Sequence, residues 1–241
     1  MSVAFNQLEA SVLGQPVSSF KSRSSALSAV QAMRQRTTVL HQILESSALA
    51  AVLMSPRLTL GQYAVVLSAW GGAWRVLEAH IATAACSPGL AELAPRPRAE
   101  LAEQDLACLG VSTLMEAERQ RHAARHVQLF DIDSDAELLG VYYVLRGSML
   151  GAKLIGRHLH EVLGLDAASG AAFFASTDES SLPWPRWLER WNQSLQQEQA
   201  IDAAVQGAVK TFSYLLDWFE ACAPSALDRA AQTRAPAGSI G

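Results

Sequence analysis

The chain has 241 residues, half of them hydrophobic and 17% charged, and its formal net charge is −4 at pH 7. This balance is typical of a globular protein, and it argues against a disordered chain and against a dedicated nucleic-acid binder. The length suits one large domain, and no stretch reaches the roughly 18 uncharged apolar residues of a transmembrane helix, so we expect no membrane span.

Helical periodicity is found along most of the chain, and the alternation typical of strands is lacking. Alanine and leucine, which favour helices, dominate the composition. We therefore predict an all-α, single-domain helical bundle over 25–223, preceded by a partly ordered extension (1–24) and followed by a flexible tail (224–241). The expected helices cover 25–54, 59–84, 98–108, 112–128, 134–163, 183–197 and 199–222.

The first expected helix contains a histidine with a carboxylate one turn later. His41 lies in the middle of AVQAMRQRTTVLHQILESSALAAVLM (29–54), and Glu45 can reach its imidazole from position i+4. A carboxylate at one ring nitrogen orients the other nitrogen, as it does in many metal-binding histidines. Arg34 lies two turns earlier on the same side. A histidine on an apolar helix face is more often a core residue than a ligand, so this helix alone does not predict a site.

A later helix is unusual because it contains four glycines, in GVYYVLRGSMLGAKLIG (140–156). Each interior glycine costs roughly 1 kcal/mol relative to alanine. Gly140, Gly147 and Gly151 share one narrow stripe at about 100° per residue, and Gly156 lies opposite. Such a stripe admits the close approach of another helix or of a flat ligand. Together with a ligating histidine on a facing helix, it indicates a site for a planar macrocycle.

Aromatic residues recur at helical spacing near the C-terminus and in the second helix. Trp184, Trp187 and Trp191 form one stripe, and Trp70 and Trp74 form a similar pair, which we interpret as core packing. The remaining histidines give no metal-binding pattern. We interpret four of them as surface residues (His122, His126, His158, His160) and leave His80 unassigned.

The three cysteines, Cys86, Cys108 and Cys222, are widely spaced and form no CxxC or zinc pattern. Because no signal peptide is found at the N-terminus, we expect reduced thiols and a cytoplasmic protein. No glycine-rich nucleotide loop is present, so electrons for any redox reaction must come from a separate donor.

Four segments resemble the heme oxygenase family. RQRTTVLHQILES (34–46) resembles the proximal helix, and YVLRGSMLGAKLI (143–155) the distal helix, especially that of the bacterial, biliverdin-producing type found beside phytochromes. LTLGQYAVVLSAWGGAWRVLEAHI (58–81) and RAELAEQDLACLG (98–110) are similar to the family's second helix and the segment that follows it. The four occur in the family's order and at roughly its spacing.

The chain departs from this resemblance at two neighbouring positions. Phytochrome-associated members usually carry an acidic residue where this chain has Arg146. Animal heme oxygenases carry an aspartate, which orders distal water, where this chain has Ser148. Bacterial members with serine at this position are still oxygenases, so Ser148 is compatible with activity.

The resemblance implies a heme oxygenase fold and a set of site residues. His41 would be the axial ligand of the heme iron, with Glu45 supporting it. Gly147, Ser148 and Gly151 would form the catalytic, oxygen-binding face. The other expected heme contacts are Arg34, Tyr142, Tyr143, Phe212 and Leu216, with Arg34 and a tyrosine near the propionates.

The implied reaction cleaves heme to biliverdin, CO and ferrous iron. It uses O2 and an external electron donor, either a ferredoxin or a flavoprotein, and the biliverdin would be available to a bacteriophytochrome. Two alternatives stay open. One is a heme carrier or sensor of the same fold, which Arg146 and Ser148 favour. The other is a non-heme member, either thiaminase-like or di-iron; for a di-iron site Glu45, Glu78, His80 and Glu103 are available as ligands.

Overall fold

The protein is described by a computed structural model that covers residues 28–84, 87–111, 127–175 and 182–232. No strand occurs in these ranges, which confirms the predicted all-α class. The elements in chain order are α2 (Ala29–Glu45), α3 (Ala48–Leu53), α4 (Leu60–Thr83), the 3₁₀ turn η1 (Pro88–Leu90), α5 (Ala99–Cys108), α7 (Asp135–Leu163), α8 (Ala172–Ala175), α9 (Trp184–Gln193) and α10 (Glu198–Gln232).

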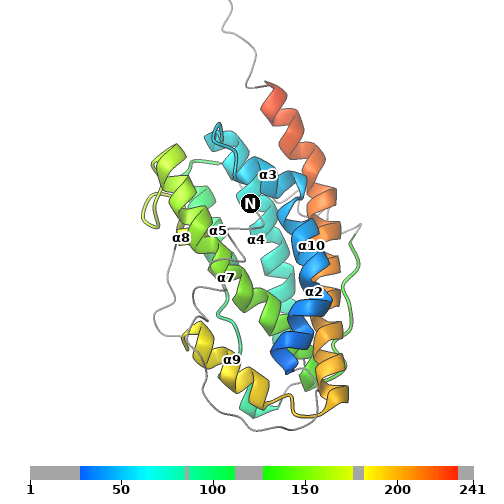
Figure 1. Ribbon diagram of the computed structural model, residues 1–241. Helices are drawn as coiled ribbons and strands as arrows, with labels where there is room; N and C mark the ends of the chain where they lie inside the picture. The colour runs from blue at the N-terminus through cyan, green and yellow to red at the C-terminus, as the bar shows by residue number, and fades with distance from the viewer. Residues whose placement is uncertain (1–27, 85–86, 112–126, 176–181, 233–241) are drawn as a thin grey trace, which may run out of the picture.

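Helix α10 organises the bundle, because it packs against α7, α2 and α4. Figure 1 shows α10 running along one side of the molecule, with α2 and α7 in front of α4 and with α9 across the lower end. By length and hydropathy α7 would also suit a membrane span, but 56% of its most apolar window is buried inside the bundle. That burial is typical of a central core helix.

Local hydrogen bonds at the helix starts explain why these helices begin where they do. Ser28 with Gln31, and Thr59 with Gln62, form reciprocal capping boxes before α2 and α4. Ser134 caps α7 by accepting from the Glu137 backbone N–H. Ser134 and Glu137 form only half of a capping box, because the Glu137 carboxylate accepts from the backbone N–H of Asp133 instead, at 2.8 Å.

Several helix limits differ from the prediction. The helix expected over 25–54 is interrupted at Ser46 and Ser47, because Ser46 donates to the carbonyls of the last turn and Ser47 caps a new helix. Helix α9 ends at Gln193 rather than 197. Helix α10 continues through Pro224 to Gln232, so the first residues of the expected tail are helical. Helix α8 was not predicted, and the helix over 112–128 falls almost wholly outside the described residues.

Helices α7 and α10 cross so closely that two glycines are required at the contact. A Cβ built on Gly140 would lie 1.8 Å from the Ala204 carbonyl oxygen, and one on Gly207 would lie 2.0 Å from the Glu137 carbonyl oxygen. No side chain fits at such distances. Gly140, the first member of the predicted stripe, therefore serves helix packing.

Two carboxylates, the half-buried Glu78 and the buried Asp105, hold the connections around α5. Glu78 accepts from the Arg98 backbone N–H at 2.6 Å, at the start of α5. Asp105 accepts from the backbone N–H of Ala172 and Phe173 at 2.8 and 2.7 Å, which holds the start of α8 against α5. Burial raises the pKa of both carboxyl groups, and these backbone hydrogen bonds oppose that rise. Both side chains thus anchor loops.

Candidate functional site

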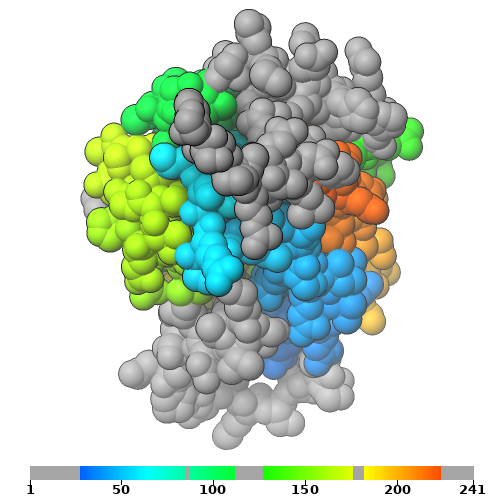
Figure 2. Space-filling view, turned by 90° about the horizontal axis from the view of Figure 1, so that it is seen from above, coloured from blue at the N-terminus to red at the C-terminus, as the bar shows by residue number. Residues whose placement is uncertain are grey.

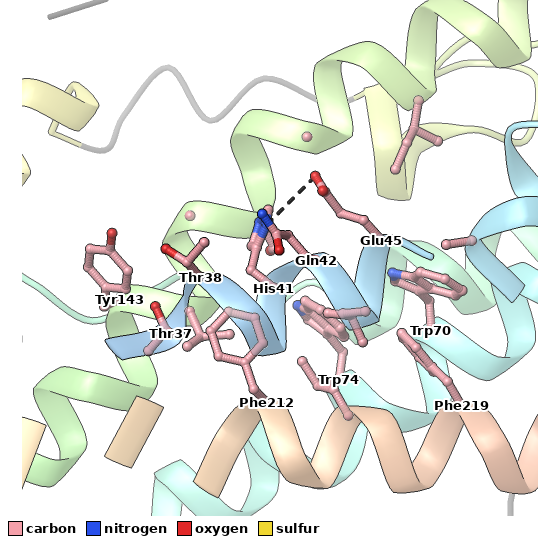
Figure 3. A pocket seen from close by; sticks show the side chains of 18 of the residues that line it. Thr37, Thr38, His41, Gln42, Glu45, Trp70, Trp74, Tyr143, Phe212 and Phe219 are labelled. Atoms are coloured by element: carbon pink, nitrogen blue, oxygen red, sulfur yellow. Dashed lines mark ion pairs between the residues drawn. The ribbon is translucent and has the colours of Figure 1, made fainter. Parts of the chain in front are cut away.

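A cavity of about 270 Å³ lies between α2 and α7, and α4 and α10 close its inner side. On α2, the His41 Nδ1 lies 3.7 Å from the Glu45 carboxylate, within ion-pair range though longer than an ordinary hydrogen bond. The Phe212 ring meets the imidazole edge-on at 5.9 Å. Figure 3 shows both His41 and Glu45 rising from α2 toward α7. The predicted i+4 pair therefore forms and faces the cavity.

The facing wall is the middle of α7. Gly147 and Gly151 line the cavity together with Val144 and Ser148. A Cβ on Gly147 would meet only the Trp184 ring, at an ordinary 3.8 Å. Unlike Gly140, Gly147 therefore borders open space rather than another backbone. The predicted stripe thus serves two purposes, with a helix contact at its start and a cavity wall further on.

The two ends of the cavity are lined by different side chains. Thr37, Thr38 and Tyr143 lie at one end in Figure 3, and Trp70 and Phe219 lie at the other. Trp70 and Phe219 stack with ring centroids 4.0 Å apart. Trp184 also lies against Tyr143 at the first end, so aromatic rings line both ends of the cavity and the hydroxyl groups lie at one.

Arg34 lines the cavity with part of its charge unpaired. Its Nε and Nη2 atoms are buried and have no hydrogen-bond partner. A buried unpaired guanidinium is costly, and buried polar groups are nearly always bonded. The cavity therefore presents two donors to a ligand, and a carboxylate is the group that matches them best.

Solved structures with the same fold include two bacterial proteins. The heme oxygenase-1 of the cyanobacterium Synechocystis, solved in complex with heme, matches with a TM-score of 0.57 and 14% identity over 86% of this chain and 97% of that one. The heme oxygenase of Leptospira interrogans matches with a TM-score of 0.55 and 17% identity over 80% and 98%. Among curated protein sequences none matches.

The sequence model of the heme oxygenase family matches residues 27–221, which is most of the chain. The protein belongs to the heme oxygenase family. The family assignment and the all-α fold confirm the resemblance that the four sequence segments indicated.

Most of the site residues predicted for a heme oxygenase do come together at the cavity. Its lining includes Arg34, His41, Glu45, Tyr143, Gly147, Ser148, Gly151 and Phe212. Two predicted contacts do not line it: Tyr142 is buried elsewhere, and Leu216 is replaced by its neighbour Leu215. Helical phase decides both cases, because neighbouring residues point about 100° apart.

The sequence predicts Tyr143 and Phe212 at the cavity but not its tryptophans. Trp70, Trp74 and Trp184 were interpreted as packing residues, yet all three line the cavity. Trp187 and Trp191 are core residues as expected. Residue spacing places the three tryptophans of α9 on one stripe. It does not indicate that the first of them, Trp184, reaches the cavity.

Each of the four residues considered for a di-iron site has a partner of its own. Glu45 faces His41, whereas Glu78 caps α5. The His80 Nε2 lies 2.7 Å from the Phe130 carbonyl oxygen, and Glu103 pairs with Arg75. Within the described ranges no three acidic, histidine or cysteine side chains converge on one point.

The other histidines lie apart from the cavity. His158 is half-buried rather than a surface residue, and its Nε2 lies 3.1 Å from the Ser55 carbonyl oxygen. This contact joins α7 to the turn after α3. In Figure 2 that turn is cyan and lies between the yellow-green end of α7 and the blue α2. His160 is exposed as predicted, and His122 and His126 fall outside the described residues.

Proposed function

We propose that the protein is a heme oxygenase that binds heme between α2 and α7. With O2 and electrons from a separate ferredoxin or flavoprotein, it converts heme to biliverdin, CO and ferrous iron. The observation that carries the proposal is a histidine on one wall, paired with a carboxylate, facing a wall of glycine at 147 and 151. Family membership and the heme complex of the Synechocystis protein support it.

The chemistry of the lining fits heme at both ends. The Arg34 donors without partners suit a propionate, and Tyr143, which also lines the cavity, offers a hydroxyl to the second one. Trp70 and Phe219 suit the apolar edge of the macrocycle. His41 would hold the iron through the ring nitrogen that does not face Glu45.

Bound heme supplies the iron at which oxygen is activated. The protein's own residues position the ring, keep water out with aromatic side chains and leave room beside Gly147 and Gly151. The Ser148 hydroxyl donates to the Leu145 carbonyl at 2.7 Å, so its oxygen is left as an acceptor facing the cavity. In this arrangement Ser148 accepts a hydrogen bond from a distal water molecule and orders it.

The test is an absorption experiment on purified protein with one equivalent of hemin. A sharp Soret band should form, and adding a reductant in air should replace it with the broad red band of biliverdin while CO is released. If hemin fails to give a histidine-ligated spectrum, the proposal is wrong. Iron-chelating agents added after turnover should recover one iron per heme.

A non-degrading heme carrier or sensor is the second candidate. It is favoured by Ser148, whose proton is committed to the Leu145 carbonyl and not directed at the cavity. A carrier would show the same Soret band, but the band would persist under reductant and no CO would form. The same experiment therefore separates the two functions.

Replacing Arg34 by Met is expected to weaken hemin binding about tenfold, because one charge-assisted hydrogen bond to a propionate is lost. The free protein should be as stable as the parent or more so, since two buried guanidinium nitrogens without hydrogen-bond partners are removed. Hemin titration and thermal melting measure the two effects. Arg36→Met is the matched control, because Arg36 lies on the same helix and pairs with Asp202 instead. Equal affinities for the two variants would contradict the role of Arg34.

Replacing Glu45 by Gln should leave heme bound and raise its reduction potential. The amide keeps the size of the side chain but removes the negative charge that lies 3.7 Å from His41 Nδ1, which makes the imidazole a poorer electron donor. Spectroelectrochemical titration gives the potential, and resonance Raman spectra should show a weaker iron–histidine stretch. An unmoved potential would make Glu45 a solvated helix residue.

A further inference from the structure

Trp184 stands at the boundary between the cavity and α9. It lines the cavity, whereas Trp187 and Trp191 on the same stripe are fully buried. Its ring centroid lies 5.7 Å from that of Tyr143, and its Cη2 atom would be 3.8 Å from a Cβ on Gly147. The indole thus covers the edge of the cavity where α7 carries no side chain.

The indole of Trp184 is held from behind. It lies nearly parallel to Trp187, with a centroid distance of 5.2 Å and an interplanar angle of 8°. Trp187 is itself fixed, because its indole N–H donates to the Leu93 carbonyl at 2.9 Å. Pro183 and Pro185 flank Trp184 and restrict the backbone on both sides. A ring held in this way has little freedom to adapt to a ligand.

Arg146 fixes the segment that carries this tryptophan. Its side chain is almost fully buried, with 7% of the residue exposed, and its guanidinium donates to the carbonyl of Leu182. Leu182 lies two residues before Trp184. Arg146 directly precedes Gly147, so the same turn of α7 provides both the open wall and the anchor of the aromatic group beside it.

We propose that Trp184 determines which of its two faces the bound macrocycle turns toward α7, and that Arg146 is the residue that positions Trp184. This inference rests on the proposed function. A macrocycle held at its centre by His41 and at one edge by Arg34 can still bind in two orientations. They differ in which face of the ring is turned toward α7. The two faces place different substituents against α7, and a rigid indole at that edge contacts only one of them favourably. The orientation in turn decides which edge of the ring lies over the glycine wall.

Proton NMR of the ferric heme complex tests the proposal, because the heme-methyl resonances report the two orientations separately. The parent should show one dominant set. Trp184→Leu should reduce the ratio of the two sets about two- to tenfold, the range expected from the loss of one aromatic contact. Trp218→Phe is the control, because Trp218 is a fully buried indole whose N–H donates to the Ala69 carbonyl and which does not line the cavity.

Arg146→Met should shift the ratio in the same direction, and Arg146→Lys should restore it in part. In a Trp184→Leu background, Arg146→Met should add nothing, because a residue that acts through Trp184 has no further effect once Trp184 is gone. Melting temperatures of the free variants identify any that fail to fold. If Arg146→Met does not fold, the orientation ratios of Trp184→Leu and Arg146→Lys test the proposal.

Three outcomes would overturn the inference. An unchanged ratio in Trp184→Leu would make Trp184 a packing residue, and the same ratio change in Trp218→Phe would make the effect non-specific. An equal effect of Arg146→Met with and without Trp184 would remove the positioning role. In each case hemin is still bound, so the proposed function stands. Failure of the parent to bind hemin would instead contradict the proposed function itself.

Discussion

His41→Ala is expected to abolish the histidine-ligated spectrum of the ferric heme complex and with it all turnover. The replacement removes the ring nitrogen that faces the cavity opposite Gly147 and Gly151. The fold should survive, because the His41 side chain is 37% exposed and alanine favours a helix. Absorption and magnetic circular dichroism of the hemin complex measure the loss, and added imidazole should restore ligation.

The matched control for this variant is His158→Ala. His158 is also half-buried, but its contact is to the Ser55 carbonyl, away from the cavity. It should leave the heme spectrum intact. If His41→Ala retained the parent's spectrum, the iron would be held by a different histidine and the proximal assignment would be lost.

Gly140→Ala is expected to lower the stability of the free protein by about 3 kcal/mol, because the new methyl group would collide with the Ala204 carbonyl of α10. For a chain of this size that corresponds to a fall of roughly 10 °C in melting temperature. Thermal unfolding followed by circular dichroism measures it. Heme binding by the fraction that folds should be nearly normal, because the collision lies outside the cavity.

The other two glycines of the stripe should behave in the opposite way. Gly147→Ala gives an ordinary 3.8 Å contact with Trp184, so the free protein should gain about 0.5–1 kcal/mol from helix propensity while turnover falls. Gly151→Leu should keep or raise the apo melting temperature and lose oxygen activation, or heme itself. A destabilised Gly151→Leu variant with intact turnover would show that position 151 is a helix contact.

The all-α fold and most of the cavity residues named above could be predicted from the sequence for a clear physical reason. Helical periodicity and the spacing of His41 and Glu45 are local features, which the sequence of one helix contains by itself. The break after Glu45 was missed because two adjacent serines are compatible with a helix until their hydroxyls bond the backbone. The aromatic lining depends on how separate helices meet, which residue spacing within one helix does not contain.

The glycine stripe shows the same limit most clearly. Gly140 and Gly147 have the same helical phase, yet one touches α10 and the other borders the cavity. The periodicity indicated correctly that something approaches the backbone closely. It could not say that the neighbour changes from protein to open space along a single helix, because the position of α10 relative to α7 is a tertiary property.

Helices α2 and α7, the two walls of the cavity, both pack on α10, and this affects which substitutions change which property of the site. Because α10 contacts both walls, it acts as a spacer that sets the width of the slot between them. Phe212, Leu215 and Phe219 are the part of this spacer that reaches the cavity. Substitutions there would change the thickness of the ligand that fits, and changes on α2 or α7 would alter its chemistry. Size selection and reactivity are thus encoded on different helices and can vary independently.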